Sequence, residues 1–127
     1  MEIIQIAQRA VDLDRAVAFY EDLLGVSVSA RFDPPGIAFF MLDGTRLLLD
    51  KVAPSSLIYL AVDDVNASVD ALREKGVEID TEPHVIFQHS DDTLGPAGED
   101  EWMAFIKDSE GNTVGLVSYA TSDPNDR

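Results

Sequence analysis

The sequence predicts an α+β fold in which two β-α-β-β-β modules form a curved eight-stranded groove, with one helix covering each four-stranded sheet. Three observations predict it. Residues 12–25 (DLDRAVAFYEDLLG) place apolar side chains at the i, i+4, i+7, i+11 spacing of one helical face, between a capping aspartate and a terminal glycine. The same pattern returns between Asp64 and Gly76. Each copy follows a β-rich run, so the chain contains an internal repeat.

The first module is predicted to span residues 3–51. Its alternating and β-branched runs predict strands at 3–11, 26–32, 37–42 and 45–51, with the helix at 12–25. Pro34, Pro35 and Gly36 separate the second strand from the third. Asp43 and Gly44 are typical of a two-residue type I′ hairpin, so the strands on either side of them should pair antiparallel.

The second module is predicted to span residues 57–119, after a short linker at 53–56. We expect strands at 57–62, at 77–80 continuing toward Phe87, at 101–107 and at 112–119, with a helix at 65–75, a loop at 88–100 and a turn at 108–111. Residues 120–127 should form a frayed tail. The whole chain, 1–127, is thus interpreted as one domain of two modules.

Side-chain parity along each strand predicts which residues face the groove. In the fifth strand Ile58, Leu60 and Val62 form the natural helix-packing set. The repeat then assigns the following residues to the groove: Gln5, Ala7, Arg9, Arg46, Leu48, Asp50, Leu57, Tyr59, Ala61, Trp102, Ala104, Thr113, Gly115 and Val117.

Composition narrows the class of function. The net charge of −15, with only nine Lys and Arg residues, argues against nucleic acid as a partner. The chain has no cysteine, which excludes thiolate metal sites and cysteine nucleophiles. No signal pattern or membrane-spanning run is apparent, so a cytoplasmic protein that does not bind membranes is expected. The acidity is interpreted either as a solvated surface or as adaptation to high salt.

Few residues carry chemistry. His84 and His89 are five apart, which on a strand puts them on opposite faces; His84 is the better groove candidate, and His89 is expected in solvated loop. Asp50 and Glu101 are either general bases of a metal-free isomerase or strand-end charges in water. Trp102 fits the core and the groove mouth equally well, and no residue can be named as catalytic.

The segments VDLDRAVAFYEDLLGV, DGTRLLLD, YLAVDDV and WMAFIKDSEGNTVGLVS resemble the vicinal oxygen chelate superfamily, which includes glyoxalase I, bleomycin-resistance proteins and extradiol dioxygenases. The resemblance covers the chain from about Ile3 to Tyr119. It implies the paired-module fold strongly, but members share a scaffold and differ in chemistry.

The metal enzymes of that superfamily place four ligands on the groove. Carried over by position, the resemblance puts those places at Gln5, Leu48, Leu57 and Gly115. Only Gln5 has a donor atom, whereas a divalent ion needs several oxygen or imidazole ligands. The resemblance together with ligand chemistry therefore predicts neither a metal nor another cofactor.

The resemblance implies a metal-independent small-molecule-binding protein of the glyoxalase/bleomycin-resistance type. Apolar area would come from Phe39, Leu48, Tyr59 and Trp102, and orientation from Gln5, Arg9, Arg46, Asp50 and His84. Arg9 matches a substrate-carboxylate arginine of glyoxalase I, which would suit an anionic group. The alternative is a metal-dependent lyase or isomerase resembling glyoxalase I, with ligands from Gln5, His84 and nearby carboxylates. A third class is a purely structural interaction domain.

A homodimer is also expected. Two-module members of the superfamily usually pair, and open sheet edges need covering.

Overall fold

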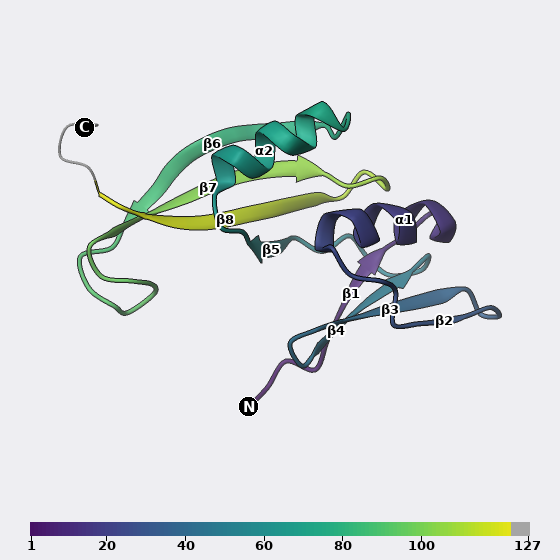
Figure 1. Ribbon diagram of the computed structural model, residues 1–127. Coiled ribbons are helices and arrows are strands. Elements are labelled where there is room, and N and C mark those ends of the chain that lie inside the picture. The colour runs from purple at the N-terminus through teal and green to yellow at the C-terminus, as the bar shows by residue number, and fades with distance from the viewer. Residues whose placement is uncertain (123–127) are drawn as a thin grey trace. The chain divides into compact units, whose positions relative to one another are not determined.

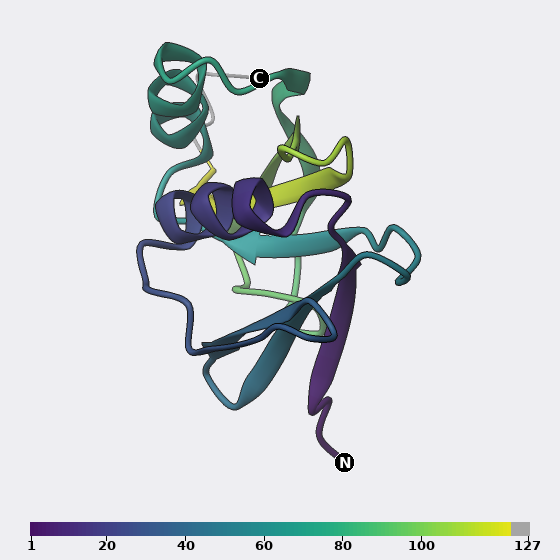
Figure 2. The same cartoon turned by 90° about the vertical axis from the view of Figure 1, so that its right-hand side faces the viewer.

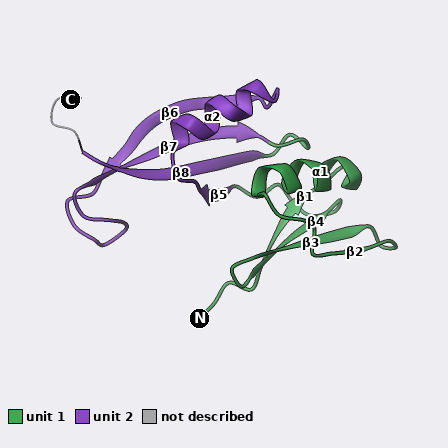
Figure 3. Ribbon diagram, in the orientation of Figure 1, with its two compact units in different colours: residues 1–57, 108–112 green, residues 58–107, 113–127 purple. Residues whose placement is uncertain are grey.

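A computed structural model describes residues 1–122 of the chain, which form two compact units (Figure 3). Unit 1 comprises residues 1–57 together with the turn 108–112. Unit 2 comprises residues 58–107 and continues from residue 113. Each unit contains one four-stranded sheet and one helix, so the α+β class and the two-module repeat are confirmed.

Unit 1 consists of β1 (Gln5–Arg9), α1 (Leu13–Leu24), β2 (Ala30–Phe32), β3 (Ile37–Leu42) and β4 (Thr45–Asp50). The strand order in the sheet is β1-β4-β3-β2, with β1 parallel to β4 and the other pairs antiparallel. Both views show α1 along one side of these strands (Figures 1 and 2).

Unit 2 consists of β5 (Ile58–Ala61), α2 (Val65–Glu74), β6 (Ile79–Gln88), β7 (Glu99–Lys107) and β8 (Thr113–Thr121). Its strand order, β5-β8-β7-β6, repeats that of unit 1, and again only the first pair is parallel. The helix α2 lies on one side of this sheet (Figure 1). Neither α1 nor α2, the helices of residues 1–122, has the length and apolar character needed to cross a membrane.

The helix caps and the hairpin turn that the sequence predicts are present in the structure. Asp12 accepts the N–H of Arg15, and Asp64 accepts the N–H groups of Asn66 and Ala67, so each aspartate caps its helix. Helix α2 ends in a Schellman motif, because the N–H groups of Gly76 and Val77 donate to carbonyls in its last turn. Asp43 and Gly44 both have positive φ (47° and 89°), as a type I′ turn requires.

Strand alternation separates a core face from an open face in each sheet. In unit 1 the core face carries Ala38, Phe40, Leu47 and Leu49, all at most 2% exposed. In unit 2 it carries Ala104, Ile106, Val114 and Leu116, all at 0% exposure. These faces pack against α1 and α2, and burial of apolar area there is the main stabilising term of each unit.

Several predicted boundaries are wrong. The second strand is only Ala30–Phe32, because the connection before it is held from the helix: the N–H of Val28 donates to the Glu21 carboxylate at 2.9 Å. β8 continues to Thr121, where it pairs with Glu99, so part of the predicted tail is strand. The rest of that tail, residues 123–127, lies outside the described residues.

A buried carboxylate organises unit 1. Asp108 is 6% exposed and accepts hydrogen bonds from the hydroxyl of Tyr20 (2.6 Å) and from the backbone N–H and side-chain amide of Asn112 (both 2.8 Å). The amide of Asn112 also donates to the carbonyl of Arg9. The turn predicted at 108–111 is therefore more than a surface connection, because its hydrogen bonds link Tyr20 of α1 to Arg9 of β1.

Glu110, in the same turn, makes a second set of hydrogen bonds to the start of α1. It accepts the N–H of Asp12 at 2.6 Å and the guanidinium of Arg15 at 2.7 Å. Burial acts to raise the pKa of Glu110, but the hydrogen bonds from Arg15 and Asp12 outweigh it and hold that pKa below its usual range.

Replacement of Tyr20 by Phe tests the buried hydrogen bond. Burial and the contact with Asp108 raise the pKa of Tyr20 above its ordinary value of about 10. Above pH 10 the unfolded chain loses this proton before the folded protein does, so the stability that Tyr20 contributes falls as pH rises. We expect Y20F to cost about 1–2 kcal/mol at pH 8 and visibly less at pH 11.

Urea denaturation of both proteins at the two pH values measures this difference. Y59F, which changes an exposed tyrosine of unit 2, serves as the control and should show no such convergence. An equal loss of stability in Y20F at pH 8 and pH 11 would contradict the assignment.

Candidate functional site

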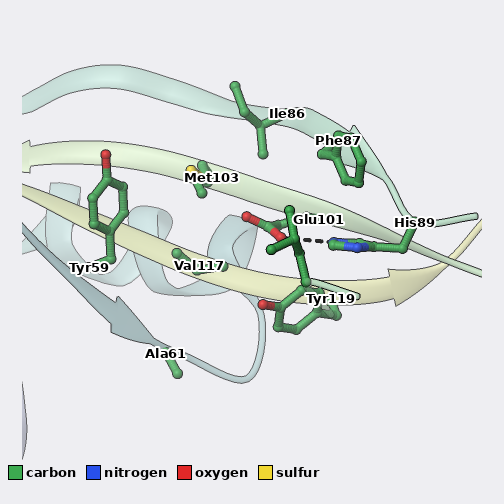
Figure 4. A pocket seen from close by; sticks show the side chains of 10 residues that line it. Tyr59, Ala61, Ile86, Phe87, His89, Glu101, Met103, Val117 and Tyr119 are labelled. Carbon is green, nitrogen blue, oxygen red and sulfur yellow. Dashed lines mark hydrogen bonds and ion pairs between the residues drawn. The ribbon is translucent and has the colours of Figure 1, made fainter. Parts of the chain in front are cut away.

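The open face of the unit 2 sheet carries a pocket with a volume of about 580 Å³ (Figure 4). Its walls are mainly apolar and aromatic, with one carboxylate. The lining residues are Tyr59, Ala61, Ile86, Phe87, His89, Leu94, Glu101, Met103, Val117 and Tyr119. All of them belong to unit 2.

Parity on β7 and β8 determines which side chains reach the pocket. Glu101 and Met103 point to it from β7, and Val117 and Tyr119 from β8. The cross-strand pairs Glu101–Tyr119 and Met103–Val117 confirm that these residues share one face. The alternate residues, such as Leu116, are buried on the side of α2.

An irregularity in β6 brings two consecutive residues to the pocket. The register of β6 against β7 shifts between Val85 and Phe87, as at a β-bulge. Ile86 and Phe87 consequently both line the pocket, although neighbours on a regular strand face opposite sides. The bulge adds apolar wall area that strict alternation would not supply.

His89 is buried beside the pocket. Its side chain is 1% exposed, and Nε2 lies 2.8 Å from Oε1 of Glu101, whose side chain is 14% exposed. The imidazole packs edge-on against Phe87, at a centroid distance of 4.8 Å, and beside Tyr119 at 5.8 Å. The pocket therefore has a carboxylate that is oriented by a buried histidine.

The expectation that His89 lies in solvated loop is wrong. Its backbone is fixed by two hydrogen bonds, from its own N–H to the carbonyl of Glu99 (2.9 Å) and from the N–H of Gly98 to its carbonyl (2.7 Å). These bonds extend the pairing of β6 and β7 by one residue. The side chain then turns inward, where burying an imidazole is tolerated because the Glu101 carboxylate accepts a hydrogen bond from its Nε2–H.

The loop 90–98 contacts the ring of His89 through Gly95. Leu94 reaches the pocket from this loop, and Gly95 lies so close that a Cβ there would be 2.8 Å from Cε1 of His89. Asp91 accepts the N–H of Thr93, and hydrogen bonding from Thr93 lowers the pKa of Asp91. The loop is thus an ordered wall of the site, stabilised by local turns.

Gly115 lies under the ring of Tyr59. A Cβ at residue 115 would be 2.6 Å from Cδ1 of Tyr59, a distance that real Cβ contacts do not show. The ring also packs edge-on against Phe105, at a centroid distance of 6.0 Å. Tyr59 can lie across β8 only because residue 115 has no side chain.

The sequence-predicted groove residues of unit 2 separate into two groups. Tyr59, Ala61 and Val117 line the pocket. His84 does not line it, and its Nδ1 lies 3.0 Å from the carbonyl of Glu82. The assignment of Trp102 and Ala104 to the groove is wrong. Trp102 pairs with Ser118, whose hydroxyl accepts the N–H of Val65 at the start of α2, so this parity belongs to the helix side.

The predicted groove residues of unit 1 share the open face of their own sheet. The β1–β4 pairing aligns Gln5 with Arg46 and Arg9 with Asp50, and the β3–β4 pairing aligns Phe39 with Leu48. Nε of Arg46 donates to Oε1 of Gln5 at 3.0 Å, and its guanidinium lies 5.9 Å from the centroid of Phe39. This face is therefore a polar and aromatic cluster, and its part in ligand binding stays a prediction.

The positions implied for a metal do not fit one. Leu48 and Leu57 offer no donor atom, and the space above Gly115 is filled by the ring of Tyr59. Within residues 1–122, no three His, Asp or Glu side chains gather in a way that would hold an ion elsewhere. The donor set of these four positions is thus unsuited to a divalent cation.

Sequence reasoning missed most of the pocket wall. Ile86, Phe87, Leu94, Met103 and Tyr119 were not predicted, and Glu101 was considered only as a possible base. Phe87, directly before the long predicted loop, was the one available signal, because aromatic residues near such a loop often line a site.

Comparisons with known proteins agree on the fold. A family model described as the Glyoxalase/Bleomycin resistance protein/Dioxygenase superfamily matches residues 2–116. No curated protein matches the sequence.

Solved structures match over most of the chain. A lactoylglutathione lyase from Agrobacterium tumefaciens has 22% identity and a TM-score of 0.69, with 92% of both chains covered. A glyoxalase/bleomycin resistance protein/dioxygenase from Alicyclobacillus acidocaldarius has 18% identity and a TM-score of 0.65, covering 93% of this chain and 91% of that one. A virulence protein from Salmonella typhimurium has 16% identity and a TM-score of 0.67, covering 94% and 98%. At these identities the likeness establishes the fold alone.

Replacing Gly95 by Ala tests the packing of the loop on His89. The φ of Gly95 is accessible to alanine, so the added methyl acts by crowding His89 and Tyr119. We expect a loss of about 1–3 kcal/mol in the free energy of unfolding, as for overpacking, with a changed chemical shift of the His89 ring protons.

Ser90→Ala, at an exposed residue of the same loop, is the matched control and should leave both readouts unchanged. A G95A protein with native stability and an unmoved His89 signal would show that the loop does not cover the histidine as described.

Proposed function

This chain belongs to the glyoxalase/bleomycin-resistance/dioxygenase superfamily, and we propose that it binds an apolar or aromatic small molecule in the unit 2 pocket without the help of a metal. The supporting observation is the pocket itself, a hollow of about 580 Å³ whose walls are mostly apolar with one oriented carboxylate. Sites for small organic ligands usually have this make-up, in which apolar walls supply affinity and a few polar groups fix orientation.

Exposure of the pocket side chains supports the same proposal. Tyr59 is 51%, Phe87 49% and Tyr119 40% exposed, although each belongs to a wall of a concave surface. Large apolar side chains left open to water and grouped in one hollow mark a binding site more often than a random surface. A ligand of drug-like size would remove this area from water.

Metal independence is proposed from ligand chemistry. The places where the superfamily's metal enzymes hold their ion carry Gln5, Leu48, Leu57 and Gly115, and the last is covered by Tyr59. Restoring a ligand at residue 115 would require displacement of that ring. Three of the four positions therefore offer no side-chain donor atom to a metal, and the fourth, Gln5, accepts a hydrogen bond from Arg46.

The second candidate is a metal-dependent lyase or isomerase resembling glyoxalase I, favoured by the structural likeness to a lactoylglutathione lyase. Its ligands would come from among Gln5, His84 and nearby carboxylates. It requires one divalent ion per chain and loss of binding or turnover when that ion is removed.

A cytoplasmic homodimer is the assembly we propose. The outer strands β1 and β2 of one sheet, and β5 and β6 of the other, each pair with one neighbouring strand only, and Phe32 and Ile86 on these edges are about half exposed. Pairing with a second copy would cover such edges.

Calorimetric titration with neutral aromatic alcohols, such as 2-naphthylmethanol and 4-biphenylmethanol, tests the binding function. We expect saturable binding of one molecule per chain that is unchanged after dialysis against EDTA. Val117→Trp should weaken it at least about tenfold because the indole fills the pocket. Val52→Trp, at an exposed residue of unit 1, is the matched control and should bind normally.

Elemental analysis of the same samples separates the two candidates. One divalent ion per chain, removed by EDTA together with binding, would establish the metal-dependent alternative. Absence of saturable binding for every alcohol, or equal binding by V117W, would overturn the assignment of this pocket.

A further inference from the structure

The geometry of the pocket points to a more specific ligand class: we propose that the bound molecule carries a cationic nitrogen, held at the carboxylate of Glu101 and against the rings of Phe87 and Tyr119. The inference rests on the proposed function, because it assigns a ligand chemistry to the same pocket. It is carried by three observations on the lining residues: their charges, the orientation of Glu101, and the position of the aromatic rings.

The two ionisable side chains next to each other in the wall, Glu101 and His89, have unequal access to a ligand. Glu101 is the lining carboxylate, and the lining set contains no lysine or arginine. The side chain of His89 is only 1% exposed, whereas that of Glu101 is 14% exposed. A ligand in the pocket can therefore contact the carboxylate, while the imidazole behind it remains out of reach.

His89 occupies one side of the carboxylate. Its Nε2 lies 2.8 Å from Oε1, and Figure 4 shows the second oxygen directed away from the imidazole. A carboxylate offers about four lone-pair sites, so Oε2 retains full capacity to accept a hydrogen bond. An ammonium N–H is a suitable donor because charge-assisted hydrogen bonds are roughly twice as strong as neutral ones.

Two aromatic residues neighbour Glu101 in the sheet and share its preference for positive charge. Phe87 pairs with Glu101 between β6 and β7, Tyr119 pairs with it between β7 and β8, and both rings pack against His89 at centroid distances of 4.8 and 5.8 Å. The face of an aromatic ring carries partial negative charge and attracts a cation within about 6 Å. Tyr59 adds a third ring to the wall.

A neutral or anionic ligand would fit this arrangement less well. It would displace water from Glu101 and leave the carboxylate without a partner on its open side, which costs free energy. A cationic nitrogen replaces that water with an ion pair and with ring contacts. The net charge of −15 acts in the same direction by raising the local concentration of cations.

Three probes of one shape measure this preference: 2-naphthylmethylammonium, 2-naphthylmethanol and 2-naphthoate, titrated calorimetrically at pH 7 and 150 mM salt. We expect the ammonium to bind at least about tenfold more tightly than the alcohol, and the carboxylate to bind most weakly. Glu101→Gln should abolish the difference between the ammonium and the alcohol while keeping the affinity for the alcohol.

Glu74→Gln is the matched control. Glu74 is an exposed residue at the end of α2, so this variant changes the net charge as much as E101Q does without touching the pocket. It should retain the full preference for the ammonium. Tyr119→Leu provides a test that leaves the carboxylate in place. A trimethylammonium probe has no N–H to donate, so its preference over the alcohol depends on the ring, and Y119L should reduce that preference.

The outcomes distinguish the two proposals. If the three probes bind equally and V117W still loses them, the pocket is a binding site but the cationic inference is wrong. The same conclusion follows if E74Q loses the preference as fully as E101Q, because the effect is then long-range charge. If none of the probes binds, the proposed function itself fails.

Discussion

The alternation of side chains along β7 and β8 is the constraint on which the rest of unit 2 depends. Helix α2 covers one face of the sheet, so every second residue is committed to the core, and the residues between them build the pocket. A shift of one residue in the pairing would exchange Glu101 for Trp102 and bury a carboxylate under the helix. The register of the sheet therefore determines which side chains form the pocket. The pairing of β6 with β7 is irregular at three places, and the one beside Phe87 lies at the pocket.

His89 and Glu101 illustrate how a binding surface acquires a fixed polar group. The two residues are twelve apart in sequence, and the ladder between β6 and β7 brings them together at its end. Packing of the imidazole between Phe87 and Tyr119 restricts its motion, and the hydrogen bond transfers that restriction to the carboxylate. Such preorganisation lowers the entropic cost of recognising a ligand.

Local signals in the sequence were sufficient for the fold. Caps at Asp12 and Asp64, the turn at Asp43 and Gly44, and the repeated helix predicted two modules with the same β-α-β-β-β order of elements. Parity was predicted correctly in β5 and β8, whose residues Tyr59, Ala61 and Val117 line the pocket. It failed in β7, because Met103 and Phe105 on one face are as apolar as Ala104 and Ile106 on the other. Periodicity cannot choose between two apolar faces.

The pairing of Tyr59 with Gly115 has a consequence for evolution and design. The ring of residue 59 on β5 has space only because residue 115, its partner on β8, has no side chain. A descendant that gains a side chain at 115 must shrink or redirect residue 59, so the two sites are expected to covary. Libraries that randomise either position alone will sample mostly unproductive sequences.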